Sequence, residues 1–271
     1  MDDVEIIVFA ICLTIAALAW LRWYVFVFSV QGNLVPVGPG RGLMGVAPLG
    51  ATAVLLLVLL TLSSSDVKDS LVYVTFYLLM GIAWLGIAIL FMPFAGLSAR
   101  DDALERRNPG AAFAVSGALI GLMLCFAGGN IGNGPGWWVV VYSAGLATVG
   151  LFILWIGLQV LTQISDSVTI GRDAAAGLRL GGFLIAAGLV LGRAVAGDWY
   201  GYGETIVDFV RFGWPVLVIA IVAALAELLL RPTVQRPFGP VLTFGLLPAS
   251  FYVGLALLIV SLEPLSLVMP R

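Results

Sequence analysis

The sequence predicts an all-α fold, a polytopic transmembrane helix bundle of about eight spans built from parallel two-helix repeats. Hydrophobic residues make up 61% of the 271 residues and charged residues only 10%, whereas a typical soluble domain has about 25% charged residues. The mean hydropathy is +1.11. Because so little polar surface cannot cover a soluble core of this size, the lipid bilayer is the expected surrounding of most of the chain.

Long apolar runs alternate with short polar, glycine-rich or proline-rich connectors. About 20 apolar residues cross the hydrocarbon core as a helix. The run at residues 4–28 is too long for a signal-peptide core and follows an acidic start, so it is predicted to be an uncleaved first span. Pro215 can kink the seventh span, because its ring removes a backbone hydrogen bond. The expected helices cover residues 4–28, 43–62, 71–94, 110–127, 137–164, 174–196, 206–230 and 241–262.

The basic residues predict the orientation of the spans. If the N-terminus is outside, nine basic residues lie at cytoplasmic ends and four at outer ends, an asymmetry typical of membrane proteins. Both termini are therefore predicted on the outer side. The nine are Arg22, Arg41, Arg100, Arg106, Arg107, Arg172, Arg179, Arg231 and Arg236, and the four are Lys68, Arg193, Arg211 and Arg271.

Two stretches, at residues 107–128 and 171–197, share a pattern. Each begins with a polar doublet, Arg107-Asn108 or Arg172-Asp173, and continues as an apolar run with glycines on one helical face. An offset of 65 residues superposes the two doublets. Each stretch follows a span that starts outside, so the predicted unit is a helix pair and both units run the same way. The glycines are expected to allow close helix packing of the small-xxx-small kind, with a sliding or gating interface as the alternative.

The two stretches also resemble a known family. L-E-R-R-N-P-G-A-A-F-A-V-S-G-A-L-I-G and I-G-R-D-A-A-A-G-L-R-L-G-G are similar to two copies of the motif of the bacterial membrane family catalogued as domain of unknown function 350. The resemblance covers roughly residues 66–198, and it departs from the family at Arg107, where the family has Gly, and at Asp173, where it has Asn. It implies a repeat fold in the bacterial inner membrane, no known enzymatic activity, and partners from envelope-stress or peptide-modifying systems.

Three parts of the chain follow from this pattern. Residues 66–198 are the expected repeat core. Residues 1–65 and 199–271 each supply one further helix pair with the same polarity, and these pairs could be diverged copies of the repeat.

The composition excludes several kinds of chemistry. There is no histidine to ligate haem or relay protons, and the single lysine, Lys68, lies outside the spans. Cys12 and Cys125 lie in separate apolar runs, where each is expected to be a small buried hydrophobe. No catalytic residue, cofactor or metal site is therefore expected, and nucleic-acid binding lacks the basic patch it needs.

Asn108 and Asp173 stand at the predicted inner starts of two helices. Short polar side chains in this position accept hydrogen bonds from the first free amides of a helix and favour its positive dipole end. Capping is therefore the preferred interpretation of both residues. The alternative is that the two helix starts meet and coordinate a cation or bind a polar group.

Arg179 and Glu227 are the charges that the apolar spans explain least well. Arg179 lies about two turns inside its helix, where a cation must snorkel or find a partner, and both remain open. Its six-residue spacing from Asp173 is poor for a pair on one helix face. Glu227 precedes Arg231 by four residues, which favours an interfacial ion pair. The alternative is a buried carboxylate that faces Arg179.

The leading hypothesis is a non-enzymatic scaffold, sensor or partner subunit of a bacterial inner-membrane system. Its partners would be the lipid bilayer and a cytoplasmic protein at the connectors of residues 100–108 and 165–172, which include Arg107 and Arg172; a homo-oligomer is also open. The rival hypothesis is a permease or channel for a small solute or ion, with Arg179, Glu227, Asn108 and Asp173 near its pathway. A membrane enzyme acting on lipid comes third.

Overall fold

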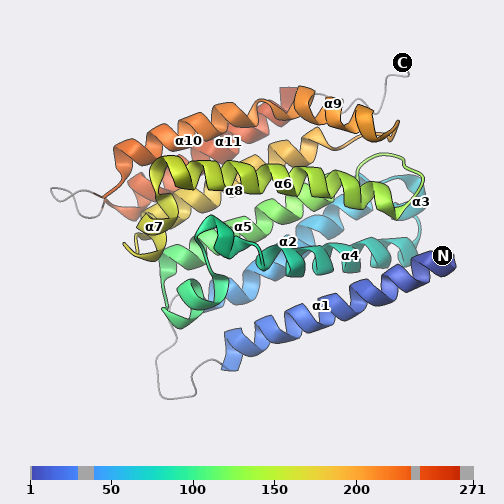
Figure 1. Cartoon of the computed structure of the whole chain (residues 1–271), viewed down its shortest axis with the longest axis horizontal. Helices are drawn as coiled ribbons and strands as arrows, with labels where there is room; N and C mark the ends of the chain where they lie inside the picture. The colour runs from blue at the N-terminus through green and yellow to red at the C-terminus, as the bar shows by residue number, and fades with distance from the viewer. Residues whose placement is uncertain (1, 30–39, 233–238, 263–271) are drawn as a thin grey trace.

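The computed structural model describes residues 2–29, 40–232 and 239–262, and these form helices without a strand (Figure 1). Seven helices are long and apolar enough to cross a membrane, and an eighth span results if the bent pair α9–α10 crosses as one. The predicted transmembrane helix bundle is therefore confirmed. The spanning helices are α1 (Asp3–Ser29), α2 (Gly40–Thr61), α4 (Leu71–Ile89), α5 (Pro109–Gly128), α6 (Trp137–Thr162), α8 (Ala174–Ala194), α9 (Tyr202–Gly213) with α10 (Val216–Leu230), and η3 (Leu242–Leu246) with α11 (Leu247–Leu262). The connectors contain α3 (Ser65–Lys68), η1 (Met92–Ala95), η2 (Ala99–Glu105) and α7 (Ile164–Thr169).

The membrane orientation stays a prediction. Arg236 and Arg271, two of the basic residues on which it depends, lie outside the described part of the chain.

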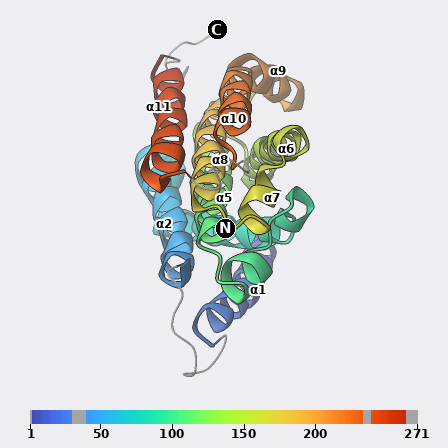
Figure 2. The same ribbon diagram turned by 90° about the vertical axis from the view of Figure 1, so that its left-hand side faces the viewer.

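α5 and α8 form the centre of the bundle, where they lie side by side (Figure 2). A Cβ atom added to Gly110, at the start of α5, would come within 2.6 Å of the Asp173 carbonyl oxygen. One added to Gly117, in mid-helix, would come within 2.5 Å of the Gly181 carbonyl oxygen, and the helix ends meet in the same way at Gly128. The two backbones therefore touch along their whole length, as small residues allow between membrane helices.

Helices that run in the same direction pack consecutively: α2 on α5, α5 on α8, and α8 on α11. Their starts meet, because a Cβ atom on Gly40 of α2 would lie 2.7 Å from Ala112 Cβ, and one on Gly245 of η3 would lie 2.9 Å from Ala175 Cα. α2 and α11 lie on one side of the central pair, and α6 and α10 on the other (Figure 2). The bundle thus contains four parallel helices that pack one on the next, with α5 and α8 at its centre.

Positions 65 residues apart share backbone geometry. Arg107 and Arg172 both have left-handed φ angles, 51° and 56°, immediately before the N-caps of α5 and α8. Gly132 and Gly197, in the loops that follow these helices, also have positive φ, 107° and 148°. The two connectors and the two following loops therefore share these backbone conformations, and the two-helix repeat stays a prediction.

Two predicted spans end earlier than expected, and a third bends. The run at residues 137–164 breaks at Gln163, which has a left-handed φ of 56°. The break is stabilised by Gln159, whose side-chain oxygen accepts a hydrogen bond from the Ser165 amide at the start of α7 (2.6 Å). In the run at residues 71–94, the α-helix α4 ends at Ile89, and the separate short helix η1, which contains Pro93, follows it. The expected kink at Pro215 is confirmed, since α9 and α10 meet there at 44°.

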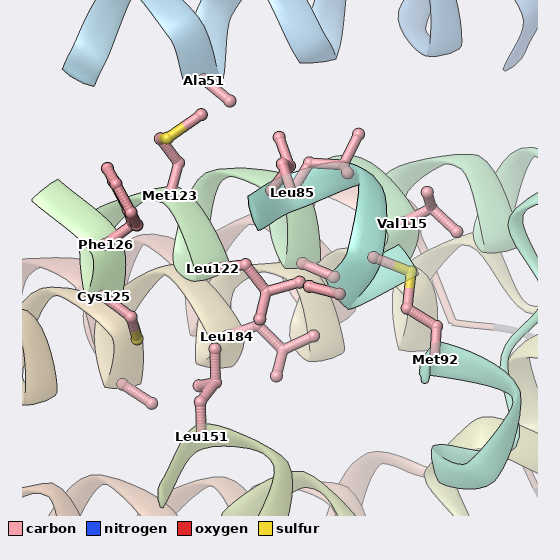
Figure 3. Packing of buried hydrophobic residues seen from close by; sticks show 14 of the residues in the cluster. Ala51, Leu85, Met92, Val115, Leu122, Met123, Cys125, Phe126, Leu151 and Leu184 are labelled. Atoms are coloured by element: carbon pink, nitrogen blue, oxygen red, sulfur yellow. The ribbon is translucent and has the colours of Figure 1, made fainter. Parts of the chain in front are cut away.

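The apolar core surrounds α5. Leu122 of α5, Leu184 of α8 and Leu151 of α6 lie together, while Met123 of α5 lies toward Ala51 of α2 (Figure 3). All five side chains are buried. α5 is hydrophobic on every face because it has a neighbouring helix on every face, as expected for a central helix.

Candidate functional site

The starts of α5 and α8 are capped by the two polar residues that the sequence singled out. Asn108 Oδ1 accepts hydrogen bonds from the amides of Gly110 (3.0 Å) and Ala111 (3.3 Å). Asp173 Oδ1 accepts one from the Ala175 amide (2.9 Å). Both side chains are buried, and both satisfy amides that have no partner within their helix. The preferred interpretation as helix caps therefore matches the observed contacts.

Arg179 does not snorkel. Its side chain is 1% exposed, and Nε donates a hydrogen bond to Glu227 Oε2 at 2.7 Å. Nη1 donates a second one to the Phe244 carbonyl oxygen at 2.6 Å. Arg179 thus joins α8 to α10 and to η3, the first turn of the last span. Partnering in the bundle interior, one of the two open interpretations, is the one observed.

The expectation that Asp173 and Arg179 are poorly placed for a pair was wrong. Asp173 Oδ2 lies 3.8 Å from Arg179 Nη2, and both side chains are buried. Asp173 is an N-cap with extended backbone angles, so it does not occupy the helical face that its spacing implies. In addition, helical side chains point toward the N-terminus, and that direction carries the long arginine back to the cap.

The expected pair between Glu227 and Arg231 was also wrong. Glu227 is fully buried and pairs with Arg179. α10 ends at Leu230, and Arg231 is its C-cap with φ −56° and ψ 148°, an extended conformation. The chain therefore leaves the helix one residue too early for the four-residue spacing to bring the two side chains together.

The ion cluster of Asp173, Arg179 and Glu227 holds one positive and two negative groups in the bundle interior. Buried charges are tolerated when they are paired and hydrogen-bonded. Arg179 Nη2 and Glu227 Oε1 nevertheless have no hydrogen-bond partner among the described residues, and the buried Tyr252 hydroxyl of α11 also lacks one. The cluster is therefore held by a single close ion pair that links the centre of the bundle to its C-terminal helices.

Arg107 and Arg172 belong to the connectors that precede α5 and α8. Arg172 Nη2 donates hydrogen bonds to the carbonyl oxygens of Arg106 (2.8 Å) and Arg107 (3.3 Å). In the other direction, Asn108 Nδ2 donates one to the Val168 carbonyl oxygen (2.6 Å). These cross-links join the two connectors into one surface, which we call the connector platform (residues 100–108 and 165–172). Its exposed residues include Arg100, Asp101, Glu105, Arg106, Asp166, Ile170 and Arg172.

The opposite end of the central pair is hollowed. A cavity of about 510 Å³ lies between the loops that follow α5 and α8, the start of α6 and residues of α1, α3, α4 and α9. Four acidic residues, Glu5, Asp66, Asp198 and Asp208, are part of its lining, and none of the described residues that line it is basic. Asp198 is held in place, because its Oδ1 accepts a hydrogen bond from the Asn133 amide (2.7 Å). The two ends of the bundle therefore differ in charge.

Two groups beside the ion cluster were not found from the sequence. The Phe244 carbonyl oxygen, which accepts from Arg179, belongs to the π-helix η3, and no sequence pattern indicated that form. Tyr252 lies in the middle of an apolar span, away from the interfacial positions that tyrosines prefer. A tyrosine at this depth was a further signal that a polar group was near.

No group of three or more metal-ligating side chains occurs among the residues with described positions. Cys12 and Cys125 are free thiols and both are buried, as their apolar surroundings predicted. Comparisons of the chain with protein families, curated proteins and solved structures found no match. The resemblance to the family of domain of unknown function 350 stays a prediction.

Proposed function

We propose that this multi-pass membrane protein is a non-enzymatic scaffold or partner subunit whose connector platform binds a protein. The observation that carries the proposal is the cross-linking of the two connectors. Arg172 donates to two carbonyl oxygens of the first connector, and Asn108 donates to one of the second. Charged side chains on this fixed surface remain exposed, among them Arg106 at 62% and Arg100 at 51%.

The packing of the bundle favours a rigid scaffold over a permease. Backbone contact between α5 and α8 leaves no room for a pore along the central pair. Arg179, Glu227 and Asp173, which the rival permease hypothesis places near a pathway, are buried against one another. A rigid bundle would hold the platform in one conformation, which lowers the entropic cost of binding a partner.

The proposal includes a location and an origin. The platform would face the cytoplasm of a bacterium, with both termini on the outer side of the inner membrane, as the excess of basic residues at the platform end favours. The two-helix repeat and the resemblance to the family of domain of unknown function 350 are part of this proposal, and the matched φ angles of Arg107 and Arg172 support the repeat.

Site-specific photo-crosslinking in native membranes tests the proposal. A benzophenone amino acid replaces Asp166, which is exposed on the platform, or Tyr200, which is 65% exposed at the opposite end. We expect an adduct of one defined mass only with the probe at residue 166. Adding Arg172→Gln to that chain should reduce the adduct severalfold, because the connectors lose their link.

Two results would contradict the scaffold. One is the absence of any adduct specific to the platform, or an adduct that Arg172→Gln leaves unchanged. The other is a flux of sodium or chloride into vesicles containing the purified protein that Arg179→Ala abolishes. That flux would support the permease instead, because the buried cluster would then act on a permeating ion.

A further inference from the structure

An apolar groove runs between α1 and α4 on the outside of the bundle. Its volume is about 580 Å³, within the range of about 300–1,000 Å³ that small-molecule sites have. Its apolar lining includes Leu18 of α1, Ile87 of α4, and Leu90, which caps the end of α4. α1 is the least buried of the spanning helices and packs mainly on α4, at the edge of the bundle (Figure 1). The groove is therefore open to lipid.

The floor of the groove is fixed by two tryptophans of α1. Trp20 Nε1 donates a hydrogen bond to the Ile82 carbonyl oxygen of α4 (3.0 Å), and Trp23 Nε1 donates one to the Met44 carbonyl oxygen of α2 (3.0 Å). These bonds hold α1 against the bundle. The groove thus has a defined shape and is more than a gap between loosely associated helices.

Basic side chains line the end of the groove that lies at the connector platform. Arg22 of α1 and Arg100 of η2 both lie over the ring of Phe26, with guanidinium carbons 5.9 and 4.3 Å from its centroid. The two cations are therefore no farther apart than about 10 Å, roughly one Debye length at 0.1 M salt. Each raises the electrostatic cost of the other unless an anion lies between them.

Arg22 has no direct ion-pair partner among the described residues. Arg100 Nε donates to Glu105 Oε1 at 2.7 Å, whereas Arg22 makes no hydrogen bond or ion pair with the residues that the structure describes. Asp101, the acidic residue of the lining, accepts a hydrogen bond from the Ser98 hydroxyl at Oδ2 (2.9 Å) and forms no ion pair with either arginine. The headgroup end of the groove therefore carries an unpaired cation beside a paired one.

We propose that this groove is a binding site for an anionic phospholipid. One acyl chain lies between α1 and α4, and the phosphate lies between Arg22 and Arg100. The combination of an apolar slot at the depth of the spans with guanidinium groups at the membrane surface matches the two parts of a lipid molecule. Arginine binds phosphate with planar, paired hydrogen-bond donors. The net negative charge of the headgroup distinguishes this lipid from a zwitterionic one.

Native mass spectrometry of the full-length protein, exchanged into detergent with equal amounts of phosphatidylglycerol and phosphatidylcholine, measures this preference. We expect more phosphatidylglycerol than phosphatidylcholine on the wild-type protein. Because one arginine near a membrane surface is worth about 1 kcal/mol toward anionic lipid, Arg22→Gln should lower the ratio of the two bound lipids about fivefold. Arg22 makes no contact that its loss would leave unsatisfied, so this variant should fold normally.

Two variants give the matched controls. Arg231→Gln removes an exposed arginine from the same end of the bundle without touching the groove, and it should leave the ratio unchanged. Leu90→Trp fills the apolar slot at a residue that is 66% exposed, and it should reduce the binding of both lipids. A ratio that Arg22→Gln does not change, or that Arg231→Gln lowers equally, would overturn the proposal. Undiminished binding of both lipids to Leu90→Trp would do the same.

Discussion

Replacing Arg179 with methionine should lower the melting temperature of the protein by about 10 °C. The substitution leaves Glu227 fully buried without its cation, and it removes the hydrogen bond that Arg179 donates to the Phe244 carbonyl oxygen. Breaking a buried ion pair by removing one partner costs about 3–5 kcal/mol. Chains of 150–250 residues lose about 2–4 °C of melting temperature per kcal/mol, so a loss of about 3–4 kcal/mol corresponds to a shift of about 10 °C.

The double variant Arg179→Met/Glu227→Met tests whether the loss of stability comes from the unpaired charge of Glu227. Because two apolar side chains of similar size can replace a buried ion pair at little cost, most of the lost stability should return. The hydrogen bond that Arg179 donates to the Phe244 carbonyl oxygen is absent from the double variant as well, so a deficit of about 1 kcal/mol should remain. Asp173 keeps its capping hydrogen bond to the Ala175 amide in both variants.

Thermal unfolding in dodecyl maltoside, followed by tryptophan fluorescence, measures these shifts. Arg231→Met serves as the control, because Arg231 is exposed and should change stability by no more than about 0.5 kcal/mol. The reasoning fails if Arg179→Met melts with the wild-type protein. It also fails if the double variant is at least as unstable as Arg179→Met, since the pair would then not be the source of the loss.

Two further substitutions test the central pair. Gly117→Ala should cost about 1–3 kcal/mol, because the new Cβ would come within 2.5 Å of the Gly181 carbonyl oxygen. Gly157→Ala is the control: a Cβ there meets nothing within 4 Å, so this variant should be neutral or stabilising in the same melting assay. Equal losses of stability in the two variants would contradict the close packing. Asn108→Ala should cost about 1–2 kcal/mol, because the helix loses its cap. Asn108→Asp should restore the cap but not the hydrogen bond to the Val168 carbonyl oxygen. Full recovery of stability in Asn108→Asp would show that this link between the connectors adds no stability.

Features that depend on neighbouring residues could be predicted from the sequence. The N-caps at Asn108 and Asp173 follow from a short polar side chain before an apolar run, and the kink follows from Pro215 alone. The glycine stripes could be recognised because glycines at these spacings lie on one face of an α-helix. Close packing at the stripes could be expected in this way, but their contact with each other is known only from the structure.

The ion pair of the candidate site was only an alternative interpretation of the sequence, which could not decide for it. Arg179 and Glu227 are 48 residues apart, and their contact depends on how α8 and α10 are rotated about their axes. The spacing of Glu227 and Arg231 favoured a different pair, and it failed because the helix ends at Leu230. The break at Gln163 was equally hidden, since it needs neither glycine nor proline and is stabilised by a side-chain hydrogen bond from Gln159.

The parallel orientation of α2, α5, α8 and η3–α11 has an electrostatic consequence. Each helix N-terminus carries a partial charge of about +0.5 from its aligned peptide dipoles, so four neighbouring starts gather positive partial charge at the platform end. The Asp173 carboxylate offsets part of this charge at the start of α8. The backbone of the remaining starts adds positive potential to that end of the bundle, and the exposed arginines strengthen it.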